Sequence, residues 1–187
     1  MKHGRGRPGR AAERIHTVDL RRVAYDPAAW QNFYVMTGGA AAALTGLLFV
    51  AMSLHSKAIV DNLFYRRRAI GALTLSTTQL FIAAAVLTPG QSVGAIGAEV
   101  EVAALLLFGA MVRQLFVRRP SGAAARSPLK EGATMLQVGV WNALFLGSGL
   151  TLMTRTGPGF YLLAVFMLEV FGWNMYVSWI LIAEVSE

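Results

Sequence analysis

The chain has 187 residues, of which 55% are hydrophobic and 14% charged; its formal net charge is +7 and it contains no cysteine. Because soluble domains carry about a quarter charged residues, this composition argues against a sizeable soluble domain and indicates lipid as the solvent. Disulfides and thiolate metal sites are excluded. The basic residues lie almost entirely outside the apolar runs, which favours contact with anionic headgroups over binding of nucleic acid.

The N-terminal segment is polar and basic, with seven Lys and Arg residues before the first apolar run. Glycine and proline near its beginning argue against regular structure there. We therefore expect residues 1–28 to form a basic, disordered tail and residues 29–187 to form a transmembrane helical domain.

The first apolar run, from Ala29 to Leu54, carries no charged residue. As a helix rising about 1.5 Å per residue it reaches roughly 37 Å, enough to cross a hydrocarbon core about 30 Å thick with some tilt. Gly38, Ala42 and Gly46 recur every four residues, on one face of this helix. Small residues at this spacing let membrane helices approach closely, so we expect this helix-packing face to be buried against another helix.

Four further apolar runs follow, each long enough to cross a bilayer. Basic connectors or short turns containing glycine and proline separate them. The predicted spans are 69–88, 93–117, 135–154 and 160–183. The expected fold class is therefore all-α, a polytopic transmembrane helix bundle of about five spans.

Five spans place the two termini on opposite sides of the membrane. The connectors at 55–68 and 118–134 hold eight basic residues, whereas the other side holds the turn at 89–92, Arg155 and the tail, of which only two basic residues lie close to the first span. Lys and Arg are enriched in short cytoplasmic connectors, which favours an N-terminus outside and a cytoplasmic C-terminus. Arginine far exceeds lysine, and alanine and glycine are abundant, as in GC-rich bacterial genomes. The expected location is the bacterial inner (plasma) membrane.

Four polar side chains fall at similar depth in their spans: Gln79, Glu101, Asn142 and Glu169. A charged side chain at the centre of a membrane helix costs about 2.5–3.5 kcal/mol even on lenient scales. We therefore expect these four residues to converge on an intramembrane polar cluster inside the bundle. Two interpretations are open: a proton or cation path through Glu101 and Glu169, or a protonated glutamic acid hydrogen-bonded to an amide that holds helices in register.

Sequence signatures of catalysis are missing. The chain has no H-E-x-x-H, Walker A or G-x-S-x-G motif. Its one histidine near a span, His55, has no second metal ligand nearby in the sequence. We expect no enzyme activity, no catalytic residue, no cofactor and no metal site.

Trp30, Phe33 and the run GGAAAALTGLLFVA over residues 38–51 resemble the opening span of a group of small bacterial membrane proteins, and Pro-Gly-Gln at residues 89–91 fits the same pattern. Some of these proteins carry the label "modulator of FtsH protease". The resemblance covers about the first half of the chain. It implies a multi-span bacterial membrane protein, and it supplies no catalytic or ligand-binding residues.

The function expected is that of an accessory, structural or regulatory membrane component. The small-residue face and the missing cofactor motifs favour action through helix–helix association, with a second copy of the chain or with another membrane protein. The alternative is a proton or cation conduit lined by Glu101 and Glu169.

Overall fold

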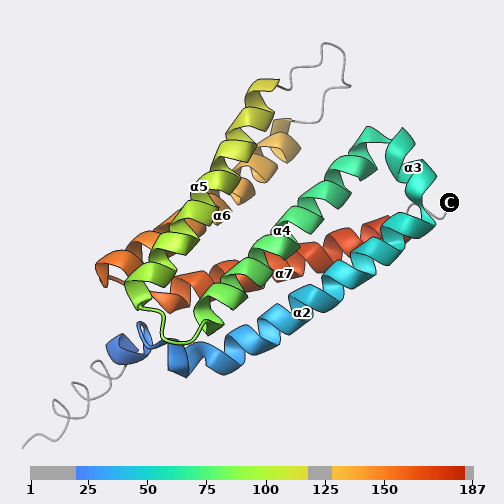
Figure 1. The fold of residues 1–187 in the computed structure, drawn as a ribbon. Coiled ribbons are helices and arrows are strands. Elements are labelled where there is room, and N and C mark those ends of the chain that lie inside the picture. Colours follow the sequence, from blue (N-terminus) through green and yellow to red (C-terminus); the bar gives the residue numbers. More distant parts are fainter. Residues whose placement is uncertain (1–19, 118–127, 184–187) are drawn as a thin grey trace, which may run out of the picture.

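The structure is a computed structural model that describes residues 20–117 and 128–183, and the regular secondary structure in these ranges is helical. Five of its helices are long and apolar enough to cross a membrane. The prediction of an all-α bundle is confirmed, and the protein is a multi-pass membrane protein. The helices (Figure 1) are α2 Pro27–Leu54, α3 Ser56–Asp61, α4 Leu63–Leu87, α5 Val93–Val117, α6 Pro128–Thr154 and α7 Phe160–Ala183.

Two helices begin earlier than the apolar runs predict. α4 begins at Leu63, so that three arginines lie in its first turns, and α6 begins at Pro128. The parts of these helices that can cross a membrane start at Tyr65 and Leu136. An apolar run marks the stretch of helix in hydrocarbon, whereas the helix itself continues to the surface, where charged side chains reach headgroups and water.

The start of α2 has clear local causes. Pro27 lies in the first turn, where its missing N–H would have no helical partner. The side chain of Asp26 accepts a hydrogen bond from the backbone N–H of Ala28 at 3.0 Å and so caps the helix. The helix therefore starts at Pro27, ahead of the predicted Ala29.

The segment just before α2 is packed against the bundle. The backbone N–H of Phe160 donates to the carbonyl of Ala24 at 2.9 Å, and the indole of Trp30 donates to the carbonyl of Val23 at 2.8 Å. Ala24 is 3% exposed. The predicted disorder of residues 1–28 is therefore wrong for residues 20–28, because backbone hydrogen bonds and ring packing hold them. Residues 1–19 lie outside the described residues.

The hydroxyl of Tyr25 fixes the same segment to the turn before α7. It donates to the carbonyl of Gly157 at 2.7 Å. Burial raises the pKa of this phenol, and the nearby charge of Arg21 acts in the opposite direction. The group therefore stays protonated at neutral pH and remains a donor.

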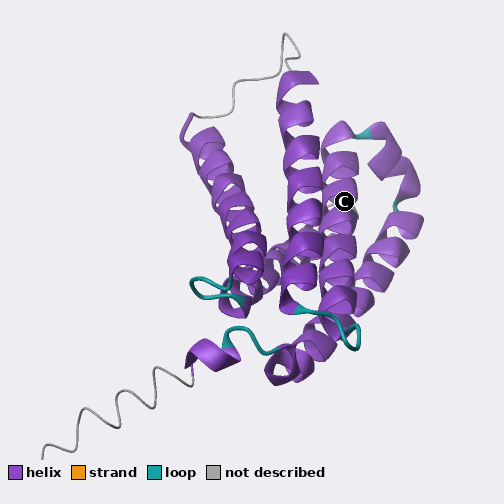
Figure 2. Cartoon of the chain, turned by 60° about the vertical axis from the view of Figure 1, so that its left-hand side comes forward, coloured by secondary structure: helices purple, strands orange, loops and turns teal. Residues whose placement is uncertain are grey.

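The helices form two antiparallel pairs joined by a fifth helix. α2 packs along α4, α5 packs along α6, and α7 contacts α2, α4 and α6. α4 and α5, although consecutive, touch much less. In Figure 1, α5 and α6 lie apart from α4 toward the end of the bundle where α5 finishes, and Figure 2 shows the same helices from another side.

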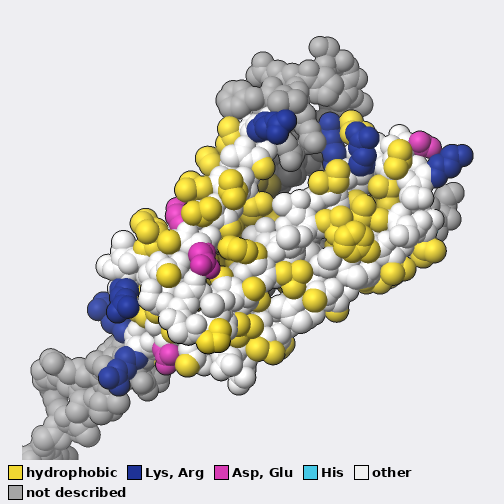
Figure 3. All heavy atoms as spheres, viewed as in Figure 1, with side chains coloured by type: hydrophobic (Ala, Val, Ile, Leu, Met, Phe, Trp, Pro, Cys, Tyr) yellow, Lys and Arg dark blue, Asp and Glu magenta, His cyan; other side chains and the backbone are white. Residues whose placement is uncertain are grey.

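The main hydrophobic core gathers side chains from all five long helices. Its centre includes the parallel rings of Phe145 and Phe166, whose centroids are 4.3 Å apart. A smaller cluster, with Leu48, Ile59 and Val177, lies at the α3 end. The outer surface is also largely apolar (Figure 3), with residues such as Leu106 at 70% and Phe49 at 57% exposure. An apolar exterior of this kind faces the lipid bilayer.

Candidate functional site

Three buried polar side chains join α4 to α7: Ser76, Gln79 and Asn174, each with 0% exposure. The amide of Gln79 donates to the carbonyl of Met167 at 2.8 Å. The amide of Asn174 donates to the hydroxyl of Ser76 at 3.0 Å and to the carbonyl oxygen of Gln79 at 3.3 Å. In a membrane, where the helices have no hydrophobic drive toward each other, such bonds fix one helix against the next.

This Ser76–Gln79–Asn174 cluster differs from the expected one. Of Gln79, Glu101, Asn142 and Glu169, only Gln79 belongs to it. The amide of Asn142 donates to the carbonyl of Val138 in its own helix at 2.8 Å. The expected convergence of the four residues is therefore wrong, because their faces point in different directions.

Glu101 lies between α5 and α6. Its Oε2 is buried without a hydrogen-bond partner in the described part of the chain, and its side chain lies directly over Gly149. A Cβ on Gly149 would also come within 3.0 Å of the Cα of Glu101. The side chain therefore fits only because residue 149 is glycine.

Gly97 makes the second close approach between the same two helices. A Cβ there would lie 2.8 Å from the backbone nitrogen of Met153 and 3.0 Å from the carbonyl oxygen of Gly149. We call this contact, made by Gly97, Glu101, Gly149 and Met153, the α5–α6 seam. The sequence places these two glycines on consecutive spans, and it does not show that they meet.

Glu169 faces the exterior of the bundle. It is exposed on α7, whereas Val170 and Asn174 are buried. At about 100° per residue, five residues carry Asn174 about 140° around the helix from Glu169. The two side chains therefore point to different surroundings, Asn174 inward and Glu169 toward lipid.

A groove lies beside Glu169 on the outer surface of α6 and α7. Its volume is about 340 Å³. Gly172 is open to the outside, with no atom within 4 Å of an added Cβ. The rings of Trp173 and Trp141 pack edge to face, with their centroids 5.5 Å apart. The residues that line this α7 groove are Gln137, Leu168, Glu169, Gly172, Trp173 and Tyr176.

The predicted helix-packing face of α2 is divided. Gly38 is buried, and a Cβ on it would lie 2.8 Å from the Cβ of Ala83 on α4. Ala42 and Gly46 are exposed, and an added Cβ at Gly46 meets nothing within 4 Å. Only the Gly38 end therefore packs inside the subunit. Contact of the exposed residues Ala42 and Gly46 with a partner remains a prediction.

No group of three or more His, Cys, Asp or Glu side chains that could hold a metal ion occurs within residues 20–117 and 128–183. A comparison of the chain with protein-family models, curated proteins and solved structures found no match. Two features stand out: the exposed carboxyl group of Glu169 beside a groove on a membrane-spanning helix, and the buried hydrogen bonds between α4 and α7.

Proposed function

We propose that this protein is a non-enzymatic membrane component that works by lateral association, with the α7 groove as the contact surface. The observation that carries the proposal is the exposure of Glu169 on the outer surface of a membrane-spanning helix. Glu169 follows Phe160 by nine residues, which puts it about 13 Å into the span.

A carboxyl group at this depth is unfavourable in contact with acyl chains. Insertion scales give about 2.5–3.5 kcal/mol for a charged side chain at a helix centre. A neighbouring helix that donates a hydrogen bond removes much of this cost. Lateral association would therefore be favoured by burying Glu169, and a monomer would leave the group in hydrocarbon.

The shape of the α7 groove suits a helix as its occupant. Gly172 lets another backbone approach closely, as small residues do at membrane helix contacts. Gln137 and Tyr176 supply groups that can donate hydrogen bonds. We propose a second copy of this chain as the partner, which makes the protein a homo-oligomer in the bilayer.

The conduit alternative has less support from the geometry. Glu101 lies in the α5–α6 seam, and Glu169 lines the α7 groove, whose lining does not include Glu101. A proton path needs groups within hydrogen-bonding reach of one another or of bridging water. The two carboxyl groups lie in different surroundings.

Cross-linking tests the association, because the native chain has no thiol. We expect Gly172→Cys to form a disulfide between copies in membranes, and we expect the control Gly109→Cys on α5, which is equally open, to remain unlinked. Glu169→Leu should lower the fraction of oligomer measured by native mass spectrometry, while leaving the fold intact. A wild-type protein that is monomeric in lipid nanodiscs and unlinked at Gly172→Cys would overturn the proposal.

We further propose the orientation with the N-terminus outside. One end of the bundle carries Lys57, Arg66, Arg67, Arg68 and Arg113, whereas the other carries fewer cations among the described residues (Figure 3). The end richer in cations is favoured as cytoplasmic.

A membrane-impermeant maleimide on intact cells tests this orientation. Ser56→Cys, at the start of α3, should stay unlabelled until the cells are broken. Ser92→Cys, in the turn before α5, should be labelled from outside. Both positions are exposed in the structure. The reverse pattern would show the opposite orientation.

A further inference from the structure

A second cavity lies on a different part of the bundle, between α4 on one side and α5 and α6 on the other. Its volume is about 310 Å³. It lies between two consecutive helices, α4 and α5, that touch little. We call it the α4–α6 cleft. Its walls are mainly apolar and include Ile70, Leu75, Leu107, Val138, Phe145 and Phe166.

Two polar side chains in the walls of the cleft, Thr74 and Asn142, donate hydrogen bonds within their own helices. The hydroxyl of Thr74 donates to the carbonyl of Ile70 at 2.8 Å, and the amide of Asn142 donates to the carbonyl of Val138 at 2.8 Å. Such back-bonding makes a polar side chain inexpensive in an apolar setting. The depth of the cleft therefore presents a surface suited to hydrocarbon.

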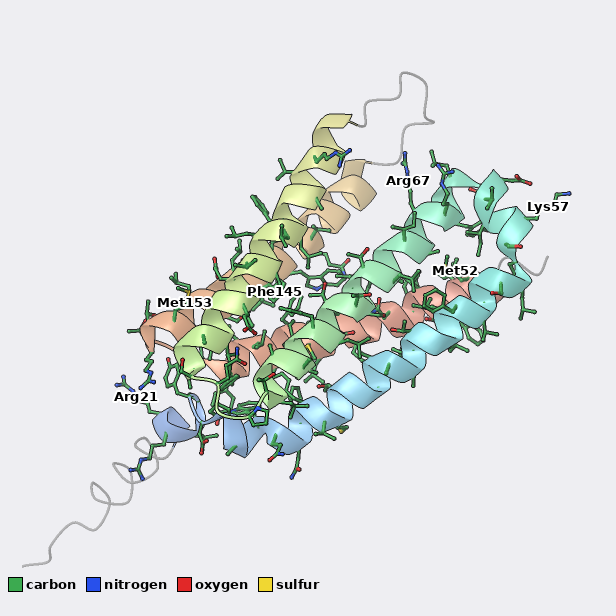
Figure 4. All side chains as sticks on the ribbon, viewed as in Figure 1. Arg21, Met52, Lys57, Arg67, Phe145 and Met153 are labelled. Atoms are coloured by element: carbon green, nitrogen blue, oxygen red, sulfur yellow. The ribbon has the colours of Figure 1, made fainter. Side chains whose placement is uncertain are left out.

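Arg67 gives the cleft a charged mouth. It lines the cleft from the beginning of α4, two residues after the start of the membrane-spanning part at Tyr65. Its Nε is buried without a hydrogen-bond partner within the described residues. Figure 4 shows its side chain at the open end of the bundle, toward which α5 also runs. The guanidinium therefore lies at the level of the headgroups, with a donor to offer.

Two neighbouring cations add to the positive charge of this end. Arg66 is exposed next to Arg67, and Arg113 is exposed one turn beyond Ala110, which lines the cleft. Figure 3 shows basic side chains on both sides of the hollow between α4 and α5. A phosphate at the mouth would be attracted by this charge, and arginine binds phosphate through paired N–H groups.

We propose that the α4–α6 cleft binds an anionic phospholipid, with one acyl chain between the helices and the phosphate on Arg67. The volume far exceeds the roughly 10–15 Å³ that one water molecule needs, so the cleft has room for part of an acyl chain. Gly71 leaves open space in the α4 wall, where the chain enters. Basic pockets between membrane helices are a known physical solution for anionic headgroups.

Lipid binding to the purified full-length protein tests the proposal. Native mass spectrometry compares phosphatidylglycerol with phosphatidylcholine of identical acyl chains, and inorganic phosphate serves as the source of free anion. We expect phosphatidylglycerol to bind more tightly than phosphatidylcholine, and phosphate alone not to compete with it. Equal binding of the two lipids, or full competition by phosphate, would overturn the proposal.

Paired variants locate the lipid. Arg67→Gln should weaken phosphatidylglycerol binding about fivefold, whereas Arg66→Gln, which does not line the cleft, should change it less. Gly71→Leu should block the acyl chain, with Gly139→Leu, an open glycine outside the cleft lining, as control. Equal effects of Arg67→Gln and Arg66→Gln would overturn the site. So would a disulfide between copies of Gly71→Cys, because a second copy would then fill the cleft.

Discussion

The α5–α6 seam and the small-residue face of α2 look alike in sequence and differ in the structure. Each brings glycines to one side of a membrane helix. At Gly97 and Gly149 the opposing helix is so close that an added Cβ would meet backbone atoms. At Gly46 an added Cβ meets nothing within 4 Å.

The difference shows that spacing of small residues permits a close approach and does not choose the partner. α5 and α6 make the most extensive contact between any two helices in the described part of the chain. Of Gly38, Ala42 and Gly46 on the predicted face of α2, only Gly38 meets α4, whereas Ala42 and Gly46 are exposed. The two exposed residues are free to contact lipid or a neighbouring protein.

Replacing Gly97 by alanine should have the largest effect. The new Cβ would meet the backbone of Met153 and Gly149, which cannot rotate away. We expect the free energy of unfolding to fall by about 1–3 kcal/mol, the usual cost of overpacking. SDS titration in mixed micelles, followed by tryptophan fluorescence, measures it. Gly94→Ala, three residues earlier in open space, should be neutral; an equal loss there would show that the seam is not tight.

The contact between α4 and α7 is a third kind of helix contact in this molecule. Hydrogen bonds between buried side chains stabilise it, and no glycine is involved. Gln79→Leu removes the donor to Met167 and leaves the Asn174 amide with one partner fewer. We expect a loss of about 1–2 kcal/mol in the same titration. The control is Thr77→Val, because that hydroxyl is exposed and bonds only within α4. Identical stabilities of Gln79→Leu and wild type would show that the cluster contributes nothing.

The smallest changes in stability should come from alanine substitutions at the two ends of the predicted packing face of α2. Gly38→Ala places a Cβ 2.8 Å from that of Ala83 and should cost about 1 kcal/mol. Gly46→Ala should change stability by less than about 0.5 kcal/mol, because the site is open. A large loss from Gly46→Ala in monomeric protein would mean that this face packs within the subunit after all.

The number and approximate limits of the spans could be predicted because both depend on length and apolar composition. Which side of each span faces inward could not. α7 is apolar around its whole circumference, so the inward side, with Leu163, Phe166, Val170 and Asn174, has no contrasting outer side in the sequence. In water, a polar outer stripe reveals the phase of a helix; in lipid, both sides are apolar.

The same ambiguity explains the error about the polar residues. Depth along a span follows from counting residues, and Gln79 and Glu169 do lie within their spans. To predict whether side chains from different helices meet, one must also know the direction of each side chain around its helix and the tilt between the helices. Asn174, five residues after Glu169, is the side chain that meets Gln79. Tight seams such as Gly97 against Gly149 were likewise invisible until both helices were placed.

The hydrogen bond between Phe160 and Ala24 restricts how many times the chain can cross the membrane between these two residues. The bond ties the entrance of the first span to the entrance of the last, so both entrances lie at the same bilayer surface. An even number of crossings must separate them, and α2, α4, α5 and α6 supply four. If any one of these four helices were removed, or lay along the membrane surface, Phe160 would lie at the opposite surface from Ala24. The hydrogen bond between them could not form, so it requires all four crossings.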